Sequence, residues 1–335
     1  MKILFVGLGS IGQRHMTNIK SLYGDTHELY ALRTNNNNLL IQNGFASTVD
    51  NLSGHLGFNL ISDIESALEL QPDVVFITNP TNLHLPFAEK FASIGASLFI
   101  EKPFAMSFSQ TKDFFNKYAN ENIFVAYQAI FDPCFKKIKE IVENEVLGKI
   151  VSARFEWGTY LPDHHPYENY LKSYASNDDM GGGVTRGLSH EIFMIVDLFG
   201  SPEKVYAKFS DVKPLDLKSD ETMMCILEFC KKQISFPVSL FLSYAQNKEM
   251  RDVKLQFEKG FVYCNFLENI VKVFEKGSND AQVFDFSDIQ RNDVFVSEIK
   301  YFFEKITEKH SSINNLDKIS IITKLIDELL KFKKE

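Results

Sequence analysis

The architecture is set by residues 2–12, which read Lys2-Ile3-Leu4-Phe5-Val6-Gly7-Leu8-Gly9-Ser10-Ile11-Gly12. An apolar run of strand length leads into the spacing GxGxxG, and a helical pattern follows through about residue 22. In such a unit the first glycine permits a tight turn, the second lets the backbone approach a pyrophosphate, and the third lets helix and strand pack closely. The helix N-terminus adds free N–H groups for the phosphates. The stretch therefore predicts dinucleotide binding at Gly7, Gly9, Ser10, Ile11 and Gly12.

The same alternation continues for about 125 residues. Short apolar runs at 28–32, 73–77, 97–100 and 123–127 are separated by helical segments. Continuous apolar strands between helices are typical of a parallel sheet that is covered on both faces. We predict a doubly wound α/β domain over residues 1–125.

Beyond residue 128 the pattern changes to long strands with period-two alternation. In 152–160, for example, Ala153, Phe155 and Trp157 share one face. Similar runs recur through residue 274, and helical segments at 294–308 and 316–332 end the chain. We predict a second, α+β domain over residues 126–335 with an open, mainly antiparallel sheet. Phenylalanine is unusually frequent, with 31 residues, and we expect an extra apolar face for an interface from Phe155, Phe209, Phe229, Phe241 and Phe257.

Composition excludes several classes of protein. With 44% hydrophobic and 24% charged residues, the 335-residue chain can build sizeable cores and is not disordered. Its net charge of −8 argues against nucleic acid as a partner. No apolar run reaches the length of a membrane span, and the four cysteines have no metal-ligand spacing. We expect a cytoplasmic protein without a metal site.

The end of the second strand bears on the choice of cofactor. NAD-binding proteins commonly place Asp or Glu there, to bond the ribose 2′-hydroxyl. This chain has Arg33 and Thr34 instead. Arg33 can pair with a 2′-phosphate, which favours NADP. The alternative is that Arg33 is a solvated loop residue and both cofactors are accepted.

Polar groups gather at two further places. Glu101-Lys102-Pro103 follows a strand of the predicted parallel sheet, at the end where ligands bind. Residues 160–174 form a loop rich in hydroxyl-binding groups, and a Gly-rich entry to a helix follows, with His190 in its first turns. We predict substrate contacts from Asp163, Lys172 and Tyr174.

Two other enzyme classes do not fit. Residues 187–191 resemble the GxSxG elbow of hydrolases, but Glu191 stands where the last glycine belongs. A sugar-nucleotide epimerase needs a YxxxK pair, whereas Tyr170 and Lys172 are only two residues apart.

Together these motifs resemble the Gfo/Idh/MocA oxidoreductase family, whose members include glucose–fructose oxidoreductase and inositol dehydrogenase. The resemblance rests on GxGxxG with residues 13–15, on residues 78–84, on 101–103, and on 181–183 with His190. It implies a Rossmann domain, a second domain with an open antiparallel sheet, and hydride transfer between a nicotinamide and a carbon of a sugar or cyclitol. It also implies a catalytic pair, Lys102 and His190, and cofactor contacts from Gly7, Gly9, Ser10, Ile11, Gly12, Arg33, Thr34, Thr78, Asn79, Pro80, His84, Glu101, Lys102 and Gln128.

One departure from the family pattern concerns the acid–base chemistry. The family's DxxH motif has Asp where this chain has Gly187, and a nearby position that is often Asp holds Phe193. Three readings remain open. Lys102 and His190 suffice, with help from Asp163 or Tyr174; or the substrate differs and the acid–base groups are relocated; or the chain is a catalytically weak dinucleotide-binding or sensing protein. The stretch 160–191 looks most like a bacterial subgroup linked to surface-polysaccharide and nonulosonate metabolism.

The predicted second sheet also bears on assembly. Helices cover one face of such a sheet, and a two-fold contact between sheets buries the other. The family resemblance points the same way. We expect a homodimer or homotetramer.

Overall fold

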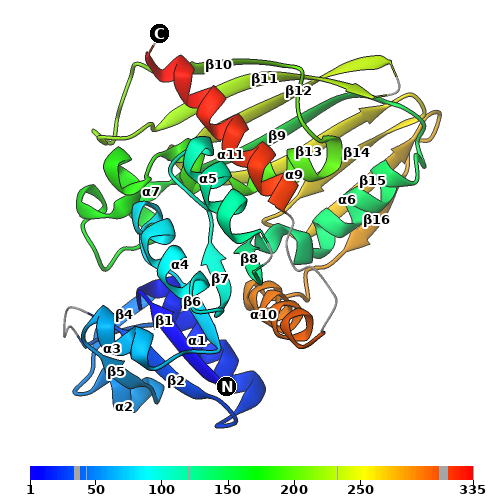
Figure 1. The fold of residues 1–335 in the computed structure, drawn as a ribbon. Coiled ribbons are helices and arrows are strands. Elements are labelled where there is room, and N and C mark those ends of the chain that lie inside the picture. The colour runs from blue at the N-terminus through cyan, green and yellow to red at the C-terminus, as the bar shows by residue number, and fades with distance from the viewer. Residues whose placement is uncertain (34–37, 43, 120, 232, 309–315, 335) are drawn as a thin grey trace.

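The computed structural model describes residues 1–33, 38–42, 44–119, 121–231, 233–308 and 316–334. Its two large sheets lie at opposite ends of the molecule, with the N-terminal sheet at the bottom of Figure 1. Thr34, one of the predicted cofactor residues, falls outside the described residues. None of the described helices is long and apolar enough to cross a lipid bilayer.

The first sheet has six parallel strands, in the order β5-β2-β1-β6-β7-β8. The strand order reverses between β1 and β6, and ligands bind at such a switch point in open α/β sheets. A separate hairpin of β3 (Leu39–Gln42) and β4 (Phe45–Thr48) follows β2 in the chain and packs against the first helix. The six strands are β1 (Lys2–Val6), β2 (Glu28–Leu32), β5 (Asn59–Ile61), β6 (Val74–Ile77), β7 (Ser97–Glu101) and β8 (Ile123–Ala126).

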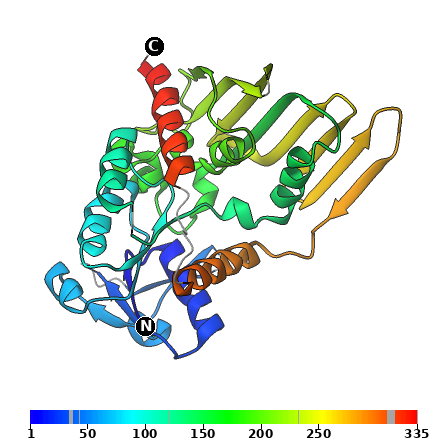
Figure 2. The same cartoon turned by 45° about the vertical axis from the view of Figure 1, so that its right-hand side comes forward.

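Helices cover both faces of this sheet, because successive strand residues are apolar on both sides. One face packs against α3 (Ile64–Glu69), α4 (His84–Ala92) and α5 (Phe108–Tyr118). The other packs against α1 (Ser10–Tyr23), α2 (Leu52–Leu56) and α10 (Arg291–Thr307). Helix α10 comes from the far end of the chain, and Figure 2 shows it against the N-terminal sheet.

The second sheet has eight strands in the order β10-β11-β12-β9-β13-β14-β15-β16. All of its pairings are antiparallel except that between β12 and β9. The predicted open, mainly antiparallel sheet is confirmed, and the connection from β12 to β13 is not a hairpin, because β9 lies between these strands and the chain crosses the end of β9 at Tyr244. The strands are β9 (Ile150–Tyr160), β10 (Lys204–Phe209), β11 (Thr222–Lys231), β12 (Ile234–Ser243), β13 (Ala245–Phe257), β14 (Gly260–Asn265), β15 (Ile270–Glu275) and β16 (Ala281–Asp285).

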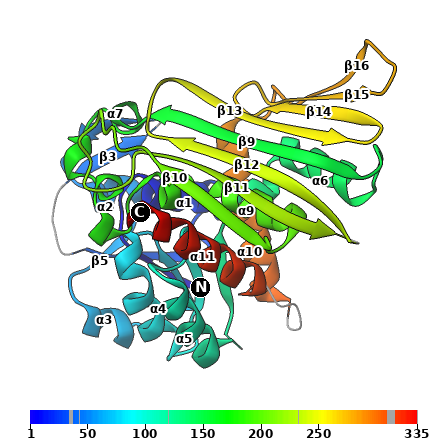
Figure 3. The same cartoon turned by 90° about the horizontal axis from the view of Figure 1, so that it is seen from above.

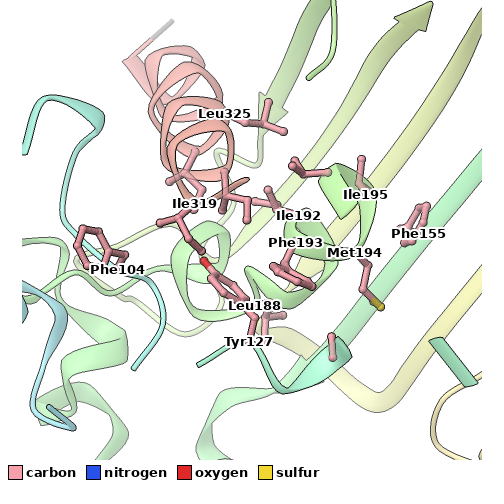
Figure 4. Close-up of a cluster of buried hydrophobic side chains, with 14 of the residues drawn as sticks. Phe104, Tyr127, Phe155, Leu188, Ile192, Phe193, Met194, Ile195, Ile319 and Leu325 are labelled. Atoms are coloured by element: carbon pink, nitrogen blue, oxygen red, sulfur yellow. The ribbon is translucent and has the colours of Figure 1, made fainter. Parts of the chain in front are cut away.

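One face of the second sheet is covered by α6 (Pro133–Glu143), α9 (His190–Phe199) and α11 (Leu316–Lys331) (Figure 3). Figure 4 shows part of this core, where residues of α9 lie between Ile319 of α11 and Phe155 of β9. The expected Phe interface is wrong for four of its five members. Phe155, Phe209, Phe229 and Phe257 are at most 8% exposed and belong to the core, and Phe241 alone is half-buried.

Candidate active site

The three motif glycines differ in what surrounds them. Gly7 has a φ of +91°, and a Cβ there would lie 2.7 Å from the Asn79 nitrogen. A Cβ on Gly12 would lie 2.6 Å from the Gly7 oxygen and 2.7 Å from Thr78 Oγ1. Gly9, at the N-cap of α1, has nothing within 4 Å of its would-be Cβ. Gly7 and Gly12 are thus required by packing, and Gly9 opens onto the space where a pyrophosphate fits.

The turn after β6 closes against this cradle. The Thr78 hydroxyl donates to the Gly7 carbonyl at 2.6 Å. Asn79 Oδ1 is buried and has no hydrogen-bond partner among the described residues, so it can serve a bound ligand. Pro80, which follows, is half-buried.

His84 supports this turn rather than facing open space. It is 1% exposed, and its ring nitrogens lie 2.8 Å from the Asn79 oxygen and 3.0 Å from the Pro103 oxygen. Burial lowers the pKa of His84. The predicted cofactor residue therefore links the turns after β6 and β7, and it acts on the cofactor site through Asn79.

Residues 13–15, which carry the resemblance but had no predicted role, hold neighbouring elements in place. Gln13 bonds the backbone of Leu39 and Ile41 in β3. The buried His15 donates from Nε2 to Glu101 Oε1 at 2.9 Å and so ties α1 to the end of β7. This hydrogen bond holds Glu101, the residue before Lys102, in place.

Lys102 is the central cation of the site. Its Nζ donates to the Gly187 carbonyl oxygen at 2.5 Å. The pKa of Lys102 is lowered to about 8, chiefly by burial; the charges of Arg251 and Arg291 act in the same direction, and the carboxylates of Glu101 and Glu191 oppose them. The amine is thus poised to exchange a proton close to neutral pH.

His190, the first residue of α9, lies near Lys102. It is 4% exposed, and its ring meets the edge of Tyr127 at 6.0 Å. Burial, and then the charge of Lys102, lower its pKa well below the ordinary value, so the imidazole is neutral at pH 7. No described residue bonds its buried Nδ1. A neutral ring with one unused nitrogen is suited to a substrate hydroxyl.

A buried ion pair that the sequence did not reveal lies next to His190. Arg251 of β13 donates from Nε to Glu191 Oε1 at 2.6 Å, and its guanidinium lies 4.1 Å from the centroid of the Trp157 ring. Burial raises the pKa of Glu191, and Arg251 opposes that change. In the sequence, the one feature that could have pointed to this ion pair is Glu191, next to His190. Its partner Arg251 is 60 residues away in sequence and could not be identified from the pattern.

The predicted substrate residues are placed differently from one another. Asp163 of α7 (Leu161–His164) and Lys172 of η3 (Tyr170–Lys172) are exposed. Tyr174 is 39% exposed; burial of its phenol, and then the charges of Glu101 and Glu168, raise its pKa to about 12. Of the three, Tyr174 is thus the one whose phenol is close enough to Glu101 to be affected by its charge.

The space at Gly187 is filled by a residue from the second sheet. A Cβ there would lie 1.7 Å from the Tyr244 hydroxyl oxygen. A phenol therefore stands where the resemblance expects an acidic side chain. Phe193, at the other departure, is buried and stacks on Tyr127 at 4.6 Å.

The remaining predicted cofactor residues follow the carboxyl ends of two strands of the first sheet. Arg33 directly follows β2, is half-buried, and has its pKa lowered by burial. Gln128 is half-buried at the start of η2 (Gln128–Phe131), just beyond β8. Within the described part of the chain, no group of three His, Cys, Asp or Glu side chains could hold a metal ion.

A parallel α/β sheet with a glycine turn between its first strand and first helix is typical of the dinucleotide-binding domains of oxidoreductases. Residues 1–128 match the model of the oxidoreductase family with an NAD-binding Rossmann fold, and residues 135–262 match the GFO/IDH/MocA C-terminal domain. The chain therefore belongs to the Gfo/Idh/MocA oxidoreductase family. This confirms the predicted family and the predicted fold class.

Curated relatives match part of the chain. Levoglucosan dehydrogenase of Pseudarthrobacter phenanthrenivorans is 30% identical over 158 residues, which is 45% of this chain and 40% of that protein. Myo-inositol 2-dehydrogenase of Thermotoga maritima is 29% identical over 153 residues, which is 44% of this chain and 42% of that protein. The matched regions thus span less than half the length of these relatives.

Solved structures match over almost the full length. Levoglucosan dehydrogenase in complex with NADH superposes with a TM-score of 0.81 at 18% identity, covering 100% of this chain and 97% of that one. The WlbA dehydrogenase of Bordetella pertussis, in complex with NADH and UDP-GlcNAcA, has a TM-score of 0.79 at 16% identity and covers 100% and 96%. At these identities the likeness establishes the fold alone.

Proposed function

We propose that this protein is an NAD(P)-dependent dehydrogenase or reductase that transfers a hydride between nicotinamide and a carbon of a sugar, a sugar derivative or a cyclitol. The observation that carries the proposal is the buried Lys102 amine, with its lowered pKa, near the neutral imidazole of His190. Both lie at the edge of the first sheet formed by the carboxyl ends of its strands, where the glycine turn follows β1. Such a pair suits an alcohol that loses a proton as its carbon loses hydride.

Each residue has a defined part in this chemistry. When bound, the nicotinamide accepts or returns the hydride. In the oxidative direction, the neutral amine of Lys102 takes the proton of the substrate hydroxyl, and the unused nitrogen of His190 bonds the same oxygen. Glu101 and His15 hold the backbone that carries Lys102, and Arg251 holds Glu191 beside His190. Tyr174, with Asp163 and Lys172 on the same loop, contacts the remainder of the substrate.

The substrate class is supported by the names of relatives and structural neighbours, which refer to inositol, levoglucosan and UDP-linked sugars. A role in surface-polysaccharide or nonulosonate metabolism fits the loop at 160–191. The four cysteines are free thiols, consistent with the reducing cytoplasm.

The proposed activity is tested by titrating the protein with NADH and NADPH, followed by nicotinamide fluorescence, and then assaying turnover with a panel of sugars, UDP-sugars and inositols. We expect binding of a nicotinamide cofactor and turnover of at least one substrate. Binding without turnover across the panel contradicts the proposed activity and supports the alternative, a dinucleotide-sensing protein on the same fold.

For the cofactor we propose a preference for NADP, because Arg33 replaces the acidic residue that bonds the ribose of NAD. Replacing Arg33 by Asp removes a cation that pairs with the 2′-phosphate and adds a repelling anion. We expect the dissociation constant for NADPH to rise by roughly 10–100-fold relative to that for NADH. The ratio of the two constants does not depend on the amount of folded protein. A native preference for NADH that Arg33→Asp leaves unchanged contradicts this proposal.

We also propose a homodimer or homotetramer that forms through the uncovered face of the second sheet. Met224 and Ile226 of β11 are 56% and 54% exposed there, and the half-buried Phe241 lies beside Met224 on β12. Contiguous apolar side chains on a sheet face are typical of a contact between subunits. Ile226→Lys is expected to lower the mass measured by light scattering to that of a smaller assembly. An unchanged mass places the contact elsewhere.

A further inference from the structure

The Tyr244 phenol occupies a volume that a side chain at position 187 would otherwise fill. A Cβ on Gly187 would lie 1.7 Å from the hydroxyl oxygen and 2.9 Å from Cζ. Tyr244 does not yield easily, because its backbone is held on both sides. Its N–H donates to the Glu221 oxygen at 2.8 Å, and its carbonyl accepts from the Leu161 N–H at 3.0 Å. The position of the phenol therefore requires glycine at 187.

This arrangement borders Lys102. The Lys102 ammonium bonds the Gly187 carbonyl, and the phenol lies against the Cα of the same residue. The two groups are consequently no more than about 8 Å apart, given standard bond lengths. The same neighbourhood includes His164, whose ring meets that of Tyr244 edge-on at 5.9 Å. Burial, and then several cations including Lys102, lower the pKa of His164 to about 4. The ammonium, the imidazole and the phenol therefore lie close to one another.

The phenol is a neutral hydrogen-bond donor at any working pH. Burial raises the pKa of Tyr244 well above its ordinary value, and Tyr174 and Asp220 add to this. A protonated phenol can donate to an oxygen of a ligand, whereas an ionised carboxylate can only accept. It also takes no proton from the substrate, so acid–base work stays with Lys102 and His190.

We infer that Tyr244 is a substrate-binding residue of the active site, whose hydroxyl donates a hydrogen bond to a sugar oxygen beside Lys102. This inference rests on the proposed function, since it takes a sugar-type molecule to span the two groups. It assigns a role to a residue at the β12–β13 crossover, far in sequence from every motif. It also explains why glycine stands at 187: any larger residue would displace the donor.

The test measures the dissociation constant of a sugar from the complex of protein and NAD(P)H, followed by nicotinamide fluorescence, together with kcat and KM where turnover occurs. Tyr244→Phe removes one oxygen and keeps the ring. We expect sugar binding and kcat/KM to weaken about 10-fold or more, while the NAD(P)H dissociation constant stays unchanged. Tyr206→Phe, on β10 with 62% of the residue exposed, is the matched control and leaves all three values unchanged.

A second variant approaches the same contact from the opposite side. Gly187→Ala pushes the phenol away and is expected to weaken sugar binding at least as much as Tyr244→Phe. In the Tyr244→Phe background the same alanine should do less harm, because the oxygen at 1.7 Å is gone. Additive losses, or a Tyr244→Phe protein that binds every sugar as the native protein does, overturn the inference. A native protein that binds sugars without turnover contradicts the proposed activity and leaves the binding test of Tyr244 intact.

Discussion

Replacing Lys102 by methionine is expected to lower kcat by about 10²–10⁴-fold, the range typical of a lost general acid–base group. Methionine keeps the length of the apolar stem and removes the amine that bonds the Gly187 carbonyl. Nicotinamide titration should show that the cofactor still binds. Lys204→Met, with the native side chain 75% exposed on β10, is the matched control. A Lys102→Met protein with native kcat rules out this residue as the acid–base group.

The same residue sets the expected pH dependence. The amine accepts a proton only when neutral, and the pKa of Lys102 is about 8. In the oxidative direction kcat should therefore rise from pH 7 to pH 9, with a midpoint close to 8; in the reductive direction, which needs the ammonium, it should fall over the same interval. A profile that is flat across this interval in both directions contradicts the assignment.

Alanine at Gly12 is expected to destabilise the fold, whereas alanine at Gly9 is expected to leave its stability nearly unchanged. At Gly12 the new Cβ meets the Gly7 oxygen at 2.6 Å and Thr78 Oγ1 at 2.7 Å, so α1 must move away from the sheet. Overpacking of this kind costs about 1–3 kcal/mol of the free energy of unfolding. At Gly9 the backbone has an ordinary φ of −77° and the methyl group enters open space, so stability should change by less than about 0.5 kcal/mol.

Cofactor binding separates the two variants further. The Gly9→Ala methyl group projects into the space proposed for the pyrophosphate, so we expect a stable protein that binds NAD(P)H weakly. Urea unfolding and fluorescence titration of both variants measure the two effects independently. A Gly9→Ala protein with native cofactor affinity would mean that the phosphates approach α1 from another direction.

Local pattern predicted much of this molecule. The glycine spacing and the apolar strands predicted the first sheet, because each signal lies within a few residues of chain. Period-two alternation predicted the second sheet but carried no information on strand direction, so the parallel pairing of β9 with β12 was missed. The same alternation did not show which face meets the helices, which is why Phe155, Phe209, Phe229 and Phe257 were misplaced.

Some residues of the candidate site could be predicted from the sequence, and others could not. Lys102 and His190 stand in recognisable motifs, and the structure brings them near each other. The residues that contact these motifs could not be recognised from the sequence. Arg251, Tyr244 and the His15–Glu101 pair join segments that are distant in sequence and that only the strand order brings together. In the sequence, Gly187 indicates the loss of the acidic side chain that the family motif has there. In the structure, the Tyr244 phenol occupies that space.

Helix α10 follows the last strand of the second sheet in the chain but packs against the first sheet. Phe302 and Phe303 pack with Phe76 of the first sheet, and Asn292 exchanges side-chain hydrogen bonds with Asn18 of α1. The domain that contains the first sheet therefore lacks part of its core without α10, whose residues follow the end of β8 by some 170 positions in the sequence. One face of the N-terminal sheet therefore stays uncovered until α10 has been synthesised.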